Sequence, residues 1–169
     1  MHRSSSLFAF LVILLAAGSV EPSAAIAQIV DYPQTRDADG VQATIQQLFD
    51  GMRAGDSTMV RAVIHPQARF QTTLTRDGRS LLHTGSVDEF IAAVGTPHDE
   101  VWDERIDGLE IRVDDNLAQA WMQYWFYLGD EFSHCGVNAL QLFWDGEKWQ
   151  IVQIIDTRRR ECEGMRDGR

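Results

Sequence analysis

The stretch from Leu117 to Thr157, LAQAWMQYWFYLGDEFSHCGVNALQLFWDGEKWQIVQIIDT, decides the fold. It contains three segments rich in apolar residues, which the turn signals Gly129-Asp130 and Asp145-Gly146 separate. A further segment, Trp102 to Val113, precedes the stretch and alternates in polarity at its end, before a turn at residues 114–116. The pattern therefore predicts a meander of four antiparallel strands.

Two helices are predicted at the start of the folded region. Apolar residues recur at helical spacing over 41–54, with Asp39 available to cap the start and Gly55 to cap the end. Asp56 can cap a second, short helix, which must end before His65-Pro66 because the residue before a proline avoids helical geometry.

A hairpin and a third helix complete the predicted elements. Strands over 69–74 and 80–83 flank the turn signal Asp77-Gly78, and Ser86 to Glu89 has the pattern of a capping box. Because a long twisted sheet curls, we expect an α+β fold: a cone-shaped, curled antiparallel sheet with three helices closing its concave side.

The N-terminus has the features of an export signal. An apolar run from Leu7 to Ala17 is too short to span a bilayer comfortably, and Ala25-Ile26-Ala27 fits a signal-peptidase site. An uncleaved anchor helix is the alternative. We expect a periplasmic or secreted protein with no membrane association after cleavage. The expected organisation is a signal peptide over 1–27, a flexible leader over 28–38, the folded domain over 39–163 and a tail over 164–169.

The charge of the chain argues against nucleic acid as a partner. Fifteen basic and 25 acidic residues give a net charge of −10, which repels phosphates and anionic membrane surfaces. The basic cluster Arg158-Arg159-Arg160 is typical of a solvated strand exit.

The two cysteines, Cys135 and Cys162, are expected to form a disulfide. An oxidising compartment favours pairing, and the expected strand register places Cys135 opposite Arg158, four residues from Cys162. The sequence contains no CxxC and no His/Cys cluster with zinc spacing, so we expect no metal and no cofactor.

Three motifs resemble a known group of proteins. They are His134-Cys135-Gly136-Val137-Asn138, Asp145-Gly146-x-x-Trp149-x-Ile151 and Asp156-Thr157-Arg158-Arg159. With the order of elements, they resemble the nuclear transport factor 2-like (polyketide-cyclase-like) superfamily, in an exported bacterial branch of unassigned function. The resemblance covers about Val41 to Cys162. The superfamily includes enzymes, binding modules and oligomerisation domains, so it implies the fold and leaves the activity open. The tyrosine that ketosteroid isomerase carries in its first helix has no counterpart over 41–54.

Candidate site residues follow from the faces of the last hairpin. If Gly146-Glu147 is its tip, Leu140 faces Gln153 and Asn138 faces Ile155 on a mostly apolar, concave face. His134 lies further along the same face. In this register Asp156 and Arg158 fall on the other face, although a bulge could turn Asp156 inward.

The strand over 117–127 allows two registers. The preferred one is favoured because small inward residues leave room for a cavity beneath the helices; it turns inward Ala118, Ala120, Met122, Tyr124 and Phe126. The other turns Trp121, Gln123 and Trp125 inward. The expected pocket residues are His134, Asn138, Tyr124, Gln153, Met122 and Ile155. The outer face carries apolar residues such as Phe143 and is a candidate homodimer interface.

Two classes of function fit these observations. The first is an exported domain that binds a small, largely apolar molecule without chemistry. The second is a dehydratase, isomerase or cyclase, with His134 as general base and Tyr124 or Asn138 polarising a carbonyl. Binding is favoured, because an enzyme usually has two titratable groups of separated pKa in one cavity and His134 alone is placed there.

Overall fold

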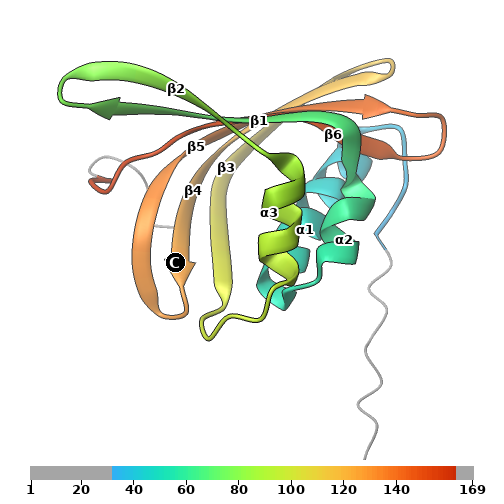
Figure 1. The fold of residues 1–169 in the computed structure, drawn as a ribbon. Helices are drawn as coiled ribbons and strands as arrows, with labels where there is room; N and C mark the ends of the chain where they lie inside the picture. The colour runs from blue at the N-terminus through green and yellow to red at the C-terminus, as the bar shows by residue number, and fades with distance from the viewer. Residues whose placement is uncertain (1–31, 163–169) are drawn as a thin grey trace, which may run out of the picture. The chain divides into compact units, whose positions relative to one another are not determined.

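The computed structural model describes residues 32–162; the expected signal peptide and tail lie outside the described residues. Three helices and six strands make up this part of the chain (Figure 1). In order they are α1 (Ala38–Ala54), α2 (Ser57–Val63), β1 (Ile64–Arg76), β2 (Arg79–Gly85), α3 (Val87–Gly95), β3 (Trp102–Asp114), β4 (Leu117–Leu128), β5 (Glu131–Trp144) and β6 (Trp149–Thr157).

The strands form one six-stranded sheet in the order β2-β1-β6-β5-β4-β3. The predicted hairpin and four-stranded meander are both present as antiparallel pairs. The sheet as a whole is mixed, because β1 pairs in parallel with β6, and this corrects the expectation of a purely antiparallel sheet. The pairing brings the last strand beside the first, so residues from both ends of the domain meet in mid-sheet.

Side-chain caps set the starts of the helices. Asp37, not Asp39 as expected, caps α1 by accepting from two backbone N–H groups, and Gly55 ends that helix with a φ of 66°. Asp56 caps α2, accepting from two backbone N–H groups at 2.9 Å, and Ser86 caps α3. The last two caps are those that the sequence predicts.

The turn between β1 and β2 requires an unusual backbone. Asp77 and Gly78 have φ values of 52° and 71°, the paired positive values of the two-residue turn that suits the twist of a hairpin. Both strands are longer than predicted and extend the hairpin away from the helices (Figure 1).

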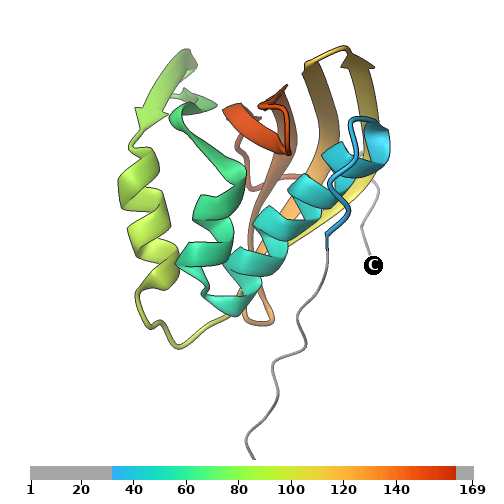
Figure 2. The ribbon, with the colours of Figure 1, turned by 90° about the vertical axis from the view of Figure 1, so that its right-hand side faces the viewer.

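The helices lie against one face of the sheet (Figure 2), where their apolar side chains meet those of the strands in a single core. Alternate residues of β4 point into this core: Ala118, Met122 and Tyr124 are each at most 2% exposed. Trp121, on the opposite face, is 53% exposed. The preferred register of this strand is therefore confirmed.

A β-bulge changes the register of the last hairpin. The pairs Trp144–Trp149 and Leu142–Ile151 form as predicted, but an extra residue on β6 follows them. Beyond the bulge Leu140 pairs with Ile154, and Asn138 pairs with Asp156. The predicted partners of Leu140 and Asn138, Gln153 and Ile155, are therefore wrong by one residue. Such a shift moves a whole set of side chains to the other face.

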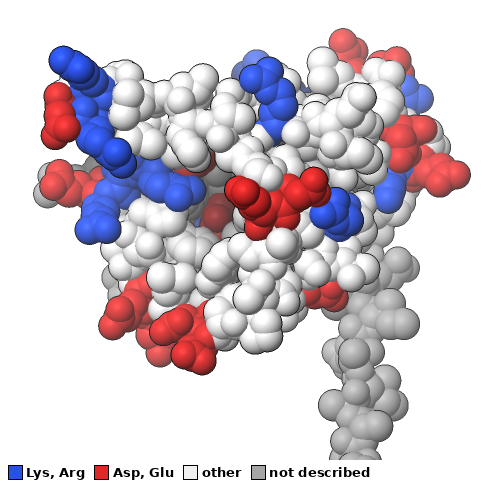
Figure 3. Space-filling view, viewed as in Figure 1, with Lys and Arg blue, Asp and Glu red and all other residues white. Residues whose placement is uncertain are grey.

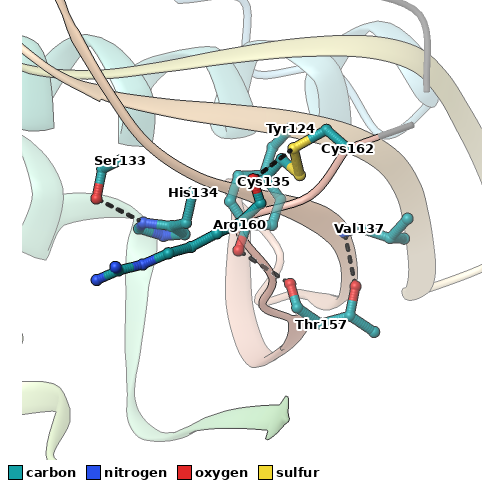
Figure 4. Close-up of a disulfide and its surroundings, with 8 residues drawn as sticks. All are labelled: Tyr124, Ser133, His134, Cys135, Val137, Thr157, Arg160 and Cys162. Atoms are coloured by element: carbon teal, nitrogen blue, oxygen red, sulfur yellow. Dashed lines mark hydrogen bonds between the residues drawn. A yellow bond between two sulfur atoms is a disulfide. The ribbon is translucent and has the colours of Figure 1, made fainter. Parts of the chain in front are cut away.

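Cys135 and Cys162 form the predicted disulfide, with Cα atoms 6.3 Å apart (Figure 4). The backbone of Cys135 exchanges two hydrogen bonds with Arg159, at 2.9 and 3.0 Å, one residue beyond the expected partner Arg158. The disulfide thus fixes the end of β6 against β5. Among residues 32–162, no helix is long and apolar enough to cross a membrane.

Candidate functional site

A cavity of about 280 Å³ lies between the helices and the sheet. Most of the exposed surface of its wall is apolar. A polar cluster, called here the polar end of the cavity, consists of linked side chains: Thr72, Glu104, Tyr124, Asn138, Asp156 and Arg158. The apolar residues are Leu48, Phe49, Met52, Phe70, Phe90, Leu140 and Ile154, and the polar ones are Gln71, Thr72, His83, Ser86, Glu104, Tyr124, Asn138, Asp156 and Arg158. Figure 3 shows a hollow on this face between the β1–β2 hairpin and strands β3–β5, with basic side chains gathered over the end of the hairpin.

Asp156 lies at the centre of the polar end and is 8% exposed. Thr72 Oγ1 donates to its Oδ1 at 2.5 Å, and Tyr124 OH donates to its Oδ2 at 2.9 Å. The Arg158 guanidinium lies 3.5 Å from Oδ2. The bulge turns Asp156 inward, where three elements of the sheet hold its carboxylate. The predicted register placed Asp156 and Arg158 on the opposite face.

Tyr124 contributes a buried hydroxyl next to this carboxylate. The hydroxyl also lies 3.0 Å from the backbone oxygen of Thr157. Thr157 is the last residue of β6, and the disulfide holds the chain that follows it against β5. Burial, with the charges of Asp156 and Glu104, raises the pKa of Tyr124 above its ordinary value, so the phenol remains protonated. Gly136 is the cross-strand neighbour of Tyr124, and a Cβ there would clash with Thr157 O and the Tyr124 ring.

Glu104, on β3, is the second carboxyl group of the cavity. Asn138 Nδ2 donates to its Oε1 at 2.6 Å. Burial raises the pKa of Glu104 to about 7; the Asn138 hydrogen bond opposes this rise and the charge of Asp156 adds to it. The cavity therefore contains a carboxyl group that titrates near neutral pH. Glu104 is absent from the expected site residues, although the sequence holds a signal for it: it stands between Trp102 and Ile106, which pack against the core from the same face of the strand.

His134 lies beside the cavity and is not part of its lining. Its Nδ1 is 3.0 Å from Ser133 Oγ (Figure 4). Its ring packs against the rings of Phe126 and Tyr124 at centroid distances of 5.0 and 5.8 Å. Burial and the charge of Arg158 lower the pKa of His134 to about 4. The imidazole is therefore neutral at physiological pH and a weak base.

The other predicted pocket residues are divided between the two faces. Tyr124 and Asn138 line the cavity. Met122 points to the same side but is fully buried in the core. Gln153 and Ile155 line a smaller depression of about 120 Å³ on the opposite face, because of the bulge. Within residues 32–162, no group of three or more His, Cys, Asp or Glu side chains is arranged to hold a metal ion.

Solved structures with the same fold are numerous, and their sequences differ widely from this one. A nuclear transport factor 2-like protein of unknown function from Shewanella baltica is 16% identical, covers 72% of this chain and 93% of its own, and gives a TM-score of 0.55. Another, described as having a cystatin-like fold, from Novosphingobium aromaticivorans, is 10% identical with coverages of 76% and 84% and a TM-score of 0.59. A third, from Cytophaga hutchinsonii, is 11% identical with coverages of 74% and 100% and a TM-score of 0.58. At these identities the similarity shows the fold alone.

A comparison with curated proteins finds no match. A family model described as "Putative lumazine-binding" matches residues 36–155, well over half of the chain. The match includes the cavity-lining residues from α1 to Ile154 on β6. The chain therefore belongs to this family, and its fold is that of nuclear transport factor 2-like proteins of unknown function.

Proposed function

We propose that this protein binds a small, largely apolar molecule in the cavity between helices and sheet. The observation that supports this most directly is the composition of the wall. Three aromatic and four aliphatic side chains surround a space that ends in a compact polar group. Binding sites for small molecules are typically concave, mostly apolar and provided with a few polar groups that orient the ligand. In this proposal the sheet is cone-shaped, and the face that carries the helices is its concave side.

The family description supplies a first ligand to test. It names lumazine, and the cavity of about 280 Å³ is near the lower end of the usual range of roughly 300–1,000 Å³ for ligand pockets. The ligand is therefore expected to be compact.

Two neighbouring isoleucines of β6 provide a matched test. Ile154 lines the cavity and Ile155 the opposite face, and both side chains are partly exposed. Calorimetric titration with lumazine and with naphthalene should show binding to the wild type and to Ile155→Trp. In Ile154→Trp the added ring occupies the cavity, so binding should be lost while the thermal melt remains cooperative. Equal binding by both variants, or none by the folded wild type, would overturn the proposal.

The proposed setting of this domain is outside the inner membrane. The disulfide is compatible with export, because such bonds persist in oxidising compartments. N-terminal sequencing of the protein from a periplasmic or secreted fraction should find Gln28 as the first residue; a start at Met1 in the membrane fraction would contradict this.

The outer sheet face is proposed as a homodimer contact. Leu117 and Trp121 there are 54% and 53% exposed, and Phe143 is 38% exposed. Sedimentation of the wild type and of Trp121→Glu tests this. A wild type that is monomeric at every concentration contradicts the proposal.

An enzyme of the dehydratase, isomerase or cyclase kind is the second candidate. Two carboxyl groups in one cavity support it: Glu104 titrates near pH 7, and Asp156 lies close by. In this version Glu104 replaces His134 as the acid–base group, because His134 is off the lining and is a weak base. Chemical change of a bound ligand that Glu104→Gln stops and His134→Ala preserves would support it.

A further inference from the structure

Two hydrogen-bond acceptors at the polar end of the cavity have no partner among residues 32–162. Asn138 is 5% exposed; its Nδ2 donates to Glu104 Oε1, and its Oδ1 accepts no hydrogen bond from a described residue. Glu104 Oε2 likewise accepts none. Both side chains line the cavity. Neither atom is among the fully buried, unpartnered side-chain atoms of the described residues, so both are open to a ligand that brings donors to them.

The two hydroxyl donors of the polar end are already used. Tyr124 OH and Thr72 Oγ1 both donate to Asp156, and Tyr124 OH also lies within hydrogen-bond distance of Thr157 O. A ligand that offers a carboxylate would therefore find neither hydroxyl free, and the one cation of the lining, Arg158, already faces the Asp156 carboxylate. A hydroxyl or amide hydrogen would instead meet two open acceptors.

The charges at the polar end also favour a ligand with hydrogen-bond donors or a positive charge. Two carboxyl groups, Glu104 and Asp156, line the cavity together with one cation, Arg158. The Arg158 side chain is 52% exposed and its Nε lies 3.5 Å from Asp156 Oδ2, so its positive charge partly neutralises that carboxylate from the solvent side. Among the described residues Glu104 forms no ion pair: Asn138 donates a hydrogen bond to it, and Arg158 acts on its charge only as the smallest of the influences on its pKa.

We propose that the cavity selects small molecules with an apolar body and a cationic or N–H-rich head, such as an amine or amidine, and rejects carboxylates. The head lies against Glu104 Oε2 and Asn138 Oδ1, and the body packs against the aromatic wall. This inference rests on the proposed binding function and specifies the chemical class of its ligand. Paired N–H groups that face two acceptors give both charge and geometric complementarity.

Affinity for such a cation should increase with pH, because ionised Glu104 attracts it and protonated Glu104 does not. The pKa of Glu104, raised to about 7, places this change near neutrality. The titratable or charged groups that line the cavity with Glu104 are Tyr124 from β4, Asp156 from β6, Arg158 directly after β6 and His83 from β2; His134 from β5 lies beside the cavity. Helix α1 contributes only the apolar Leu48, Phe49 and Met52 to the cavity.

Benzamidine, benzamide and benzoate share one ring and differ in the head group, so they form a matched set of probes. At pH 8 we expect benzamidinium to bind the wild type at least about tenfold more tightly than benzoate, with benzamide between them. At pH 6, where roughly one tenth of Glu104 is ionised, the preference should fall. Glu104→Gln should abolish the preference at both pH values. Glu110→Gln, on an exposed site of the same strand, should retain it.

The outcomes separate this inference from the proposed function. If naphthalene binds and is excluded by Ile154→Trp, but benzoate binds as tightly as benzamidinium, the cavity is a binding site and the inference about its head group is wrong. A loss of benzoate binding in Arg158→Gln would then identify Arg158 as an anion site. If no aromatic probe binds the folded protein, both proposals fail. A benzamidinium preference that persists in folded Glu104→Gln also overturns the inference.

Discussion

Replacing Glu104 with glutamine should change the pH dependence of stability in a defined direction. The pKa of this carboxyl group is about 7 in the folded chain against an ordinary value of 4.5. Between these values the folded state binds the proton and the unfolded state releases it, so the free energy of unfolding falls as pH rises. The contribution of Glu104 is fully present below pH 4.5 and is lost above pH 7.

The magnitude follows from the same two pKa values. The difference, 7 − 4.5 = 2.5, multiplied by 1.36 kcal/mol for each pH unit, gives about 3 kcal/mol. Glutamine keeps the acceptor for Asn138 and never ionises. Relative to the wild type, Glu104→Gln should therefore gain about 3 kcal/mol in unfolding free energy between pH 4.5 and pH 8.

Urea unfolding of both proteins at half-unit pH steps measures this difference directly. Subtracting the two curves removes the titration of every other group that the substitution leaves undisturbed. The control is Glu110→Gln, on the same strand at an exposed position, whose difference from the wild type should vary little with pH. A flat difference for Glu104→Gln, or one that falls with rising pH, would refute the assignment of Glu104 as a buried, proton-binding carboxyl group.

Three further predictions concern the surroundings of the cavity. Tyr124→Phe removes a hydrogen bond to the Asp156 carboxylate, so the free energy of unfolding should fall by about 1.5–3 kcal/mol in urea titrations; no loss would mean that water satisfies this carboxylate. Gly136→Ala should destabilise by at least about 1–3 kcal/mol, because the new Cβ meets backbone, whereas Gly85→Ala, with open space around its Cβ, should cost little; equal melting temperatures would contradict the close approach. Reducing the disulfide, whose cysteines are 27 residues apart, should cost about 3–4 kcal/mol in the chain-entropy model; alkylation of both thiols in the native protein without reductant would contradict the bond.

The order of elements could be predicted from the sequence because its signals are local. A helix cap, a turn residue and a hydrophobic period each act over a few neighbouring residues, so Asp56, Ser86 and Asp77-Gly78 identify their elements without knowledge of the rest of the fold. The cysteine pair was also predictable. The chain between Arg158 and Cys162 is long enough for the disulfide to form whether Cys135 lies opposite Arg158, as expected, or opposite Arg159, as observed.

The site was less predictable because it depends on non-local geometry. A single bulge on β6 exchanges the faces of Ile155 and Asp156, and the hydrophobic pattern Ile154-Ile155 carries no signal for which residue turns inward. Glu104 gains its properties from strands distant in sequence, through Asn138 and burial. His134 was singled out for its residue type, and its surroundings make it a weak base.

The position of β6 also determines when the protein can fold. Of the strands in residues 32–162 this one is synthesised last, yet it lies between β1 and β5 in the middle of the sheet. Until residues 149–157 emerge, the β1–β2 hairpin and the β3–β5 meander are separate pieces, each with an unpaired edge. Such edges can pair with other chains, and closure over so long a sequence distance is slow. A nascent chain stopped before Trp149 would therefore have no cavity and would expose two sheet fragments with aggregation-prone edges. A chaperone that holds the chain would have to cover both edges until β6 is synthesised.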